Sequence, residues 1–121
     1  MLSYGMKAKN RYFSIETGRS SGLYCGWGGA FSQYTSSNGK INNWNHVVIV
    51  YDGNYRFCYL NGRMRSRERL KLDTVPSDLM IGTRLHDTEH SFTGSIRNIA
   101  IYDRALTPTE IKLLNRYGML D

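Results

Sequence analysis

Short runs of apolar residues, separated by polar and turn-forming residues, make up most of the 121-residue chain. The runs are rich in aromatic and β-branched side chains, which predicts strands rather than helices. We expect strands at 11–16, 23–27, 44–51, 55–60, 63–72, 79–82 and 92–102. Many short strands in succession indicate an all-β fold, either an antiparallel sandwich or a barrel.

Two tight turns set the order of the central strands. Asp52-Gly53-Asn54 and Asn61-Gly62 are hairpin sequences, because these residues readily adopt the positive φ angles that tight turns require. They bracket the predicted strand 55–60. The segments 46–51, 55–60 and 63–72 are therefore expected to form an antiparallel meander.

A single helix is predicted near the end of the chain. Thr107–Glu110 forms a capping box with proline at the first helical position. Ile111, Leu114 and Tyr117 then recur at helical spacing, and Gly118 is a suitable terminator. The chain therefore combines a β-rich body with one short C-terminal helix at 107–117.

One predicted strand is strongly basic. Its alternate positions are all cationic: Arg63, Arg65, Arg67, Arg69 and Lys71. Because side chains alternate between the faces of a strand, an ideal strand here carries five cations on one face. Two interpretations remain open: a solvated face whose charges discourage aggregation, or a surface on which the four arginines bind an acidic glycan or other polyanion. The net charge of +6 favours anionic partners in general.

Length and composition describe one ordinary globular domain. The chain is 40% apolar and 21% charged, and its longest apolar run, 47–51, is far shorter than the roughly 20 residues of a membrane span. The first residues carry neither the basic nor the apolar segment of a signal peptide. Cys25 and Cys58 either pair or remain two buried thiols, so they leave the compartment open.

Tests for catalytic and metal chemistry favour a protein without enzymatic activity. Retaining glycoside hydrolysis needs two carboxyl groups roughly 5 Å apart. The glutamates are remote from one another in the sequence, and Asp87 and Glu89 lie in a predicted loop. His86 and His90 have an i, i+4 spacing, but zinc binding at that spacing needs a helix, which their neighbours do not favour. No nucleic-acid-binding signature is present, so we expect no nucleic-acid partner.

Five motifs follow one another in a characteristic order: Trp44–Gly53, Tyr59–Gly62, Leu79–Gly82, Phe92–Ile96 and Ile101–Glu110. In this order they resemble the laminin-G-like family within the concanavalin A-like lectin/glucanase superfold, over residues 44–117. The resemblance implies a two-sheet antiparallel β-sandwich (jelly roll) with one short C-terminal helix. Trp44 is expected to pack between the two sheets.

The resemblance also implies a binding module. We expect non-catalytic binding of carbohydrate or of a surface partner, and an acidic glycan suits the basic strand. Trp27 and Tyr34 are candidate residues for stacking on sugar rings. No cofactor is expected. Some members of the family hold calcium at the rim of the sandwich, where Asp87 is the candidate ligand here, although no full set of oxygen ligands assembles from the sequence. The resemblance further implies an extracellular or surface-associated location.

The chain, taken as a single domain over 1–121, departs from the family at its beginning. Members usually carry a further strand or two before the segment equivalent to 1–16, and the first of these pairs with the strand equivalent to 95–102. That strand is therefore expected to expose an unpaired edge with Arg97 as its gatekeeping charge, which predicts a homodimer or strand exchange. Two alternatives remain, namely a small glycan-degrading enzyme on the same fold and a self-assembling structural protein.

Overall fold

The computed structural model describes residues 2–6, 8, 10–17, 23–27, 34–35, 43–83 and 91–118, with the backbone alone for 17, 23–27 and 34–35. Its strands are β1 (Leu2–Gly5), β2 (Tyr12–Thr17), β3 (Leu23–Trp27), β4 (Tyr34–Thr35), β5 (Val47–Tyr51), β6 (Tyr55–Leu60), β7 (Arg63–Arg69) and β8 (Met80–Ile81). The helix α1 spans Pro108–Tyr117.

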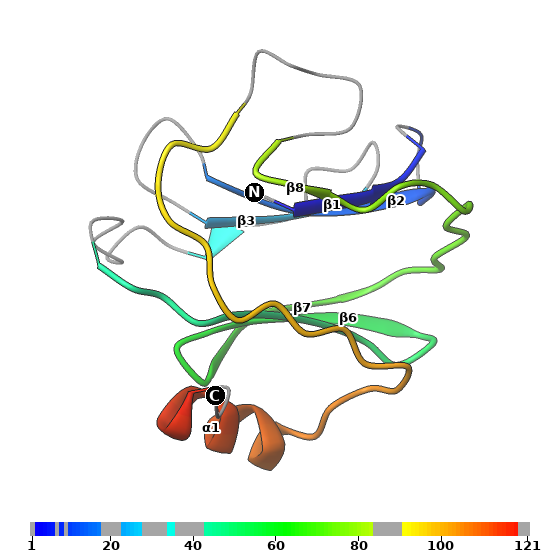
Figure 1. The fold of residues 1–121 in the computed structure, drawn as a ribbon. Coiled ribbons are helices and arrows are strands. Elements are labelled where there is room, and N and C mark those ends of the chain that lie inside the picture. Colours follow the sequence, from blue (N-terminus) through cyan, green and yellow to red (C-terminus); the bar gives the residue numbers. More distant parts are fainter. Residues whose placement is uncertain are drawn as a thin grey trace.

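Within the described residues, the strands form two antiparallel sheets. The five-stranded sheet has the order β4-β3-β2-β1-β8, and the three-stranded sheet has the order β5-β6-β7. The sheets are stacked face to face, and α1 lies against the outer side of the three-stranded sheet (Figure 1). The predicted sandwich with one C-terminal helix is confirmed, and so is the central meander.

Both predicted hairpins form as their residues dictate. The Asp52 carboxylate accepts hydrogen bonds from the backbone amides of Asn54 at 2.9 Å and Tyr55 at 2.7 Å, which holds the first turn. In the second turn, Asn61 and Gly62 have φ angles of 51° and 75°. Two consecutive positive φ angles match the right-handed twist of the flanking strands, so this turn sets the start of β7.

An apolar cluster holds α1 against the three-stranded sheet. Val50 and Tyr59 of the sheet are buried with Leu106 and Ile111, and Ile111 is fully buried. Burial of this kind stabilises a fold by roughly 1.5–3 kcal/mol for each large side chain. Tyr117, which the helical spacing places near this face, is instead 59% exposed. The sheet face that carries Val50 and Tyr59 is therefore the face covered in part by the helix.

The opposite face of the three-stranded sheet looks toward the five-stranded sheet. It carries Arg56 and Cys58, which alternate along β6 with the helix-facing Phe57 and Tyr59 and both have a relative exposure of 0%. Cys58 is disulfide-bonded, and the only other cysteine in the sequence is Cys25. The space between the sheets thus contains a charged side chain as well as apolar ones.

Residues 92–102 differ from the sequence prediction, because they form no strand in the structure. Among the described residues, their backbone groups form one hydrogen bond, from the Phe92 amide to the Gly82 carbonyl at 2.7 Å. Asn98 has a φ of 56°, which bends the chain in the middle of this segment. The structure also contains two strands that the sequence pattern does not predict, β1 and β4.

Trp44 is a second difference. The sequence predicts that it packs between the sheets, but its side chain is 59% exposed. The strand β5 begins only at Val47, so Trp44 precedes the strand that would have directed it inward. Its ring contacts Arg97 instead, with the guanidinium carbon 4.4 Å from the ring centre.

Candidate ligand-binding face

A β-bulge in β7 decides where the basic side chains lie. Cys58 pairs with Ser66, but the next residue, Tyr59, pairs with Met64, so Arg65 is an extra residue without a partner position on β6. The alternation of side chains is interrupted at this point. The prediction of five cations in one row on one face is therefore wrong.

Because of the bulge, the predicted basic residues do not all lie on one face of the sheet. Arg67 pairs with Phe57 and Arg69 pairs with Tyr55, so these four side chains share one face. Arg63 pairs with Leu60 before the bulge, and Lys71 follows the end of β7. The whole predicted set is exposed to solvent: Arg63, Arg65, Arg67, Arg69 and Lys71.

Tyr55, Phe57, Arg67 and Arg69 form what we call the aromatic-arginine face. The guanidinium carbon of Arg67 lies 4.1 Å from the centre of the Tyr55 ring and 6.0 Å from that of Phe57. The two rings are 6.2 Å apart. A cation over an aromatic ring gains about 0.5–1 kcal/mol at an exposed site. This contact therefore favours one position of the Arg67 head group above the sheet.

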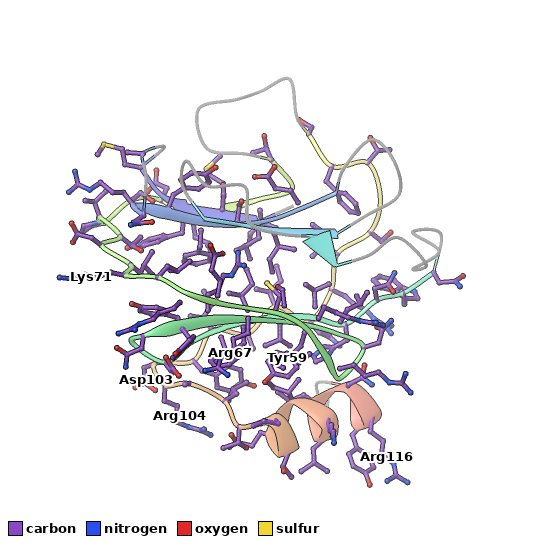
Figure 2. All side chains as sticks on the ribbon, turned by 180° about the vertical axis from the view of Figure 1, so that it is seen from behind. Tyr59, Arg67, Lys71, Asp103, Arg104 and Arg116 are labelled. Carbon is purple, nitrogen blue, oxygen red and sulfur yellow. The ribbon has the colours of Figure 1, made fainter. Side chains whose placement is uncertain are left out.

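The aromatic-arginine face lies on the same side of the sheet as α1. Tyr59 and Arg67 project from the sheet toward that side in Figure 2, and Lys71 stands apart from them. Phe57 packs against the cluster formed by Val50 and Ile111, so the apolar contact between sheet and helix continues into this face. The helix therefore borders the face rather than burying it, since Arg67 and Arg69 remain exposed.

The only acidic residue of β7 points away from this face. Glu68 pairs in register with Arg56, and its carboxylate lies 3.1 Å from the Arg56 guanidinium. Burial lowers the pKa of Arg56, and the charge of Glu68 opposes that shift. Because Glu68 is committed to this ion pair, it does not neutralise the arginines on the outer face.

One acidic group does lie close enough to affect Arg67. Hydrogen bonds from the backbone amides of Tyr55 and Asn54 lower the pKa of Asp52, and the charge of Arg67 lowers it further. The Asp52 carboxylate is therefore ionised at neutral pH, but it is already occupied by the hairpin turn. Among the described carboxylates, none forms an ion pair with Arg67 or Arg69.

Tyr51 fixes the end of β7 next to the hairpin. Its hydroxyl lies 2.9 Å from the Gly53 carbonyl oxygen and 3.3 Å from that of Leu70, and it accepts a hydrogen bond from the Leu72 amide at 3.0 Å. These contacts join the turn after β5 to the exit from β7. Arg69 therefore projects from a backbone that is held on both sides.

The remaining predicted site residues lie elsewhere. Trp27 belongs to β3 and Tyr34 to β4, which are strands of the other sheet, and the structure does not describe their side chains. Asp87, the candidate calcium ligand, falls outside the described residues. In the described part of the chain, no three metal-binding side chains gather into a possible ion site.

Sequence reasoning did not identify Tyr55 and Phe57 as site residues. Their alternate positions on the strand before the Asn61-Gly62 turn were a usable signal, because a hairpin places them opposite the basic strand. The correct partners nevertheless depend on the bulge at Arg65, which shifts the register by one residue.

Comparison with known proteins supports the same architecture. A laminin G family model, described as "Concanavalin A-like lectin/glucanases superfamily", matches residues 2–112. The fold is similar to the crystal structure of an S-layer domain-containing protein (residues 221–444) from Clostridium thermocellum, with a TM-score of 0.57 and 19% sequence identity. The similarity covers 95% of this chain and 61% of that chain. No curated protein sequence matches this chain.

None of the helical segments in the described residues has the length and apolar character needed to cross a membrane. The family match extends over almost the whole chain, and the two stacked antiparallel sheets agree with it. The chain therefore belongs to the laminin-G-like family of the concanavalin A-like lectin/glucanase superfamily.

Proposed function

We propose that this domain is a non-catalytic binding module for an acidic glycan, and that the ligand docks on the aromatic-arginine face. The observation that carries the proposal is the position of Arg67. Its guanidinium is stacked 4.1 Å from the centre of the Tyr55 ring, and no described carboxylate is paired with it. A cation held in this way is available to a ligand without first breaking an internal ion pair.

The chemistry of the face suits a sugar that carries carboxylate or sulfate groups. Guanidinium groups bind such anions through two parallel hydrogen bonds, which gives orientation as well as affinity. Arg67 and Arg69 supply two such groups on one strand, about 6.6–6.8 Å apart along it. Tyr55 and Phe57 add ring surface against which the apolar side of a sugar ring packs. The face therefore combines the two kinds of contact that an acidic glycan requires.

The absence of catalysis is part of the proposal. Glu68 is paired with the buried Arg56, and Glu110 is paired with Arg104 beside the helix cap, so both carboxylates have structural roles. Prolonged incubation with sulfated and uronic-acid polysaccharides should release no reducing ends above a protein-free blank. A steady, enzyme-dependent release would contradict this part of the proposal.

We also propose a surface-associated location, consistent with the S-layer domain-containing protein whose fold this chain resembles. The sequence identity between the two is 19%, so the support for the location comes from the shared fold. A disulfide at Cys58 is compatible with an oxidising compartment, where such bonds persist.

A glycan array tests the ligand class. Wild-type protein should bind sulfated or uronic-acid glycans and leave their neutral counterparts unbound. The variant Arg67→Gln/Arg69→Gln should lose most of this signal, because Gln stays polar but removes both the positive charge and the guanidinium group that binds an anion through two hydrogen bonds. The matched control is Lys112→Gln/Arg116→Gln, which removes two charges from exposed positions on α1. Equal signals from both variants, or preferential binding to neutral glycans, would contradict the proposed face.

A further inference from the structure

A second surface of the molecule has the properties of an unpaired strand. All residues from 93 to 105 are exposed. Large apolar side chains are among them, with exposed fractions of 42% for Ile99, 72% for Ile101 and 43% for Tyr102. Within the described part of the chain, no backbone amide or carbonyl of residues 93–105 forms a hydrogen bond with another backbone group. Unpaired backbone beside exposed apolar side chains favours the addition of a strand.

The sequence of this segment is complementary to itself when two copies run antiparallel. With Ala100 on the two-fold axis, Ile99 of one copy lies opposite Ile101 of the other. In the same register Arg97 lies opposite Asp103, twice in the pair. Residues 97, 99, 101 and 103 are alternate positions along the strand, so their side chains share one face of the paired strands. The two outer positions are ion pairs, the inner ones are apolar, and the axis holds a small residue.

We propose that this segment is a homodimer interface, in which residues 97–103 of two copies pair as antiparallel strands centred on Ala100. This interaction goes beyond the proposed glycan binding and uses a different surface. The partner is a second copy because the register brings opposite charges together at both ends. An isologous contact of this kind closes after two copies, so it produces dimers rather than filaments.

Two features of the single chain must change when the strands pair. Asn98 has a φ of 56° and would move to an extended conformation, as strand pairing requires. Arg97 lies 4.4 Å from the Trp44 ring and would reorient toward Asp103 of the second copy. Asp103 itself lies on the segment that leads into α1, where it is exposed (Figure 2). Because the bend at Asn98 must be straightened before the strands pair, it weakens dimerisation, and a substitution at this position tests the proposal.

Sedimentation equilibrium over a micromolar-to-millimolar concentration series tests the register. Wild-type protein should form dimers. Arg97→Asp and Asp103→Arg should each weaken dimerisation by about tenfold or more, because each places like charges opposite one another twice. An equimolar mixture of the two variants should dimerise about as tightly as wild type, since opposite charges then face each other again.

The mixture separates charge pairing from other effects of the substitutions. Loss of the Trp44 contact in Arg97→Asp cannot be repaired by adding the Asp103→Arg protein, whereas a lost ion pair can. Arg116→Asp, which makes the same charge change on α1, should leave the dimer unchanged. Monomeric wild-type protein throughout the series, or a mixture as monomeric as either variant alone, would overturn the proposal.

The variant Asn98→Val tests the dimer proposal independently, because it changes the preferred backbone conformation without changing any charge. A β-branched residue disfavours positive φ and favours the extended conformation, so this variant should form a tighter dimer than wild type. An equally weak or weaker dimer would overturn the requirement that residue 98 becomes part of a strand.

Discussion

The extra residue at Arg65 decides which charges face each other in the three-stranded sheet. A regular hairpin after the Asn61-Gly62 turn would continue the pairing of Leu60 with Arg63 and place Arg67 opposite Arg56. The bulge shifts the register by one, so that Glu68 lies opposite Arg56. Two cations facing each other in the interior would be destabilising, whereas Arg56 and Glu68 form an ion pair at 3.1 Å.

Glu68→Gln should therefore destabilise the fold. The substitution replaces the carboxylate beside the buried Arg56 with a neutral amide, which still accepts a hydrogen bond, and a charge-assisted hydrogen bond exceeds a neutral one by about 1–2 kcal/mol. Glu68 retains some exposure, with 37% of its side chain accessible, so we expect the lower part of that range. Urea unfolding gives the free energy of unfolding for wild type and variant.

The control for this experiment is Asp73→Asn, which makes the same charge change at an exposed position just beyond β7. It should unfold at nearly the wild-type urea concentration. The ion pair has no stabilising role if Glu68→Gln has the same midpoint as this control.

At the level of elements, the sequence correctly predicted those turns and helices that are determined by interactions between residues close in the chain. The two hairpins follow from Asp52-Gly53 and Asn61-Gly62, and α1 follows from its capping box, since each depends on residues close in the chain. The segment 92–102 has the composition of a strand but forms none, because strand formation also requires a neighbouring strand. The bulge at Arg65 breaks the simple alternation on which the predicted basic row depended.

The cap of α1 makes the stability of the helix dependent on pH. The bidentate hydrogen bond from Arg104, at 2.6 and 3.0 Å, is the largest cause that lowers the pKa of Glu110 from 4.5 to about 2, followed by hydrogen bonds from Thr107. Because the folded state favours the ionised form, Glu110 contributes stability above pH 4.5. That contribution should disappear as the pH falls from 4.5 toward 2.

Glu110→Gln should consequently have a lower melting temperature than wild type at neutral pH, and the difference should shrink progressively below pH 4.5 to a small remainder at pH 2. Thermal unfolding followed by circular dichroism between pH 2 and 7 measures this convergence. A difference that stays constant down to pH 2 would show that ionisation of Glu110 is not involved.

At the level of the whole molecule, the sandwich places two exposed surfaces on one small domain. The aromatic-arginine face lies on the outer side of the three-stranded sheet, beside α1, and residues 93–105 form the surface proposed for dimerisation. The sequence identified the arginines of the first surface but not its aromatic residues, because cross-strand partners depend on the register. The predicted burial of Trp44 was wrong for a related reason, because the apolar character of a residue does not reveal that the strand β5 begins only after it.

The most direct test of glycan binding is the salt concentration at which the domain elutes from immobilised heparin. Charge-driven binding to a polyanion weakens steeply with salt, because released counterions supply much of the driving force. Wild type should be retained, Arg67→Gln/Arg69→Gln should elute at clearly lower salt, and the control Lys112→Gln/Arg116→Gln should elute close to wild type. Elution of the two double variants at the same salt concentration would contradict the account, because net charge alone would then explain the retention.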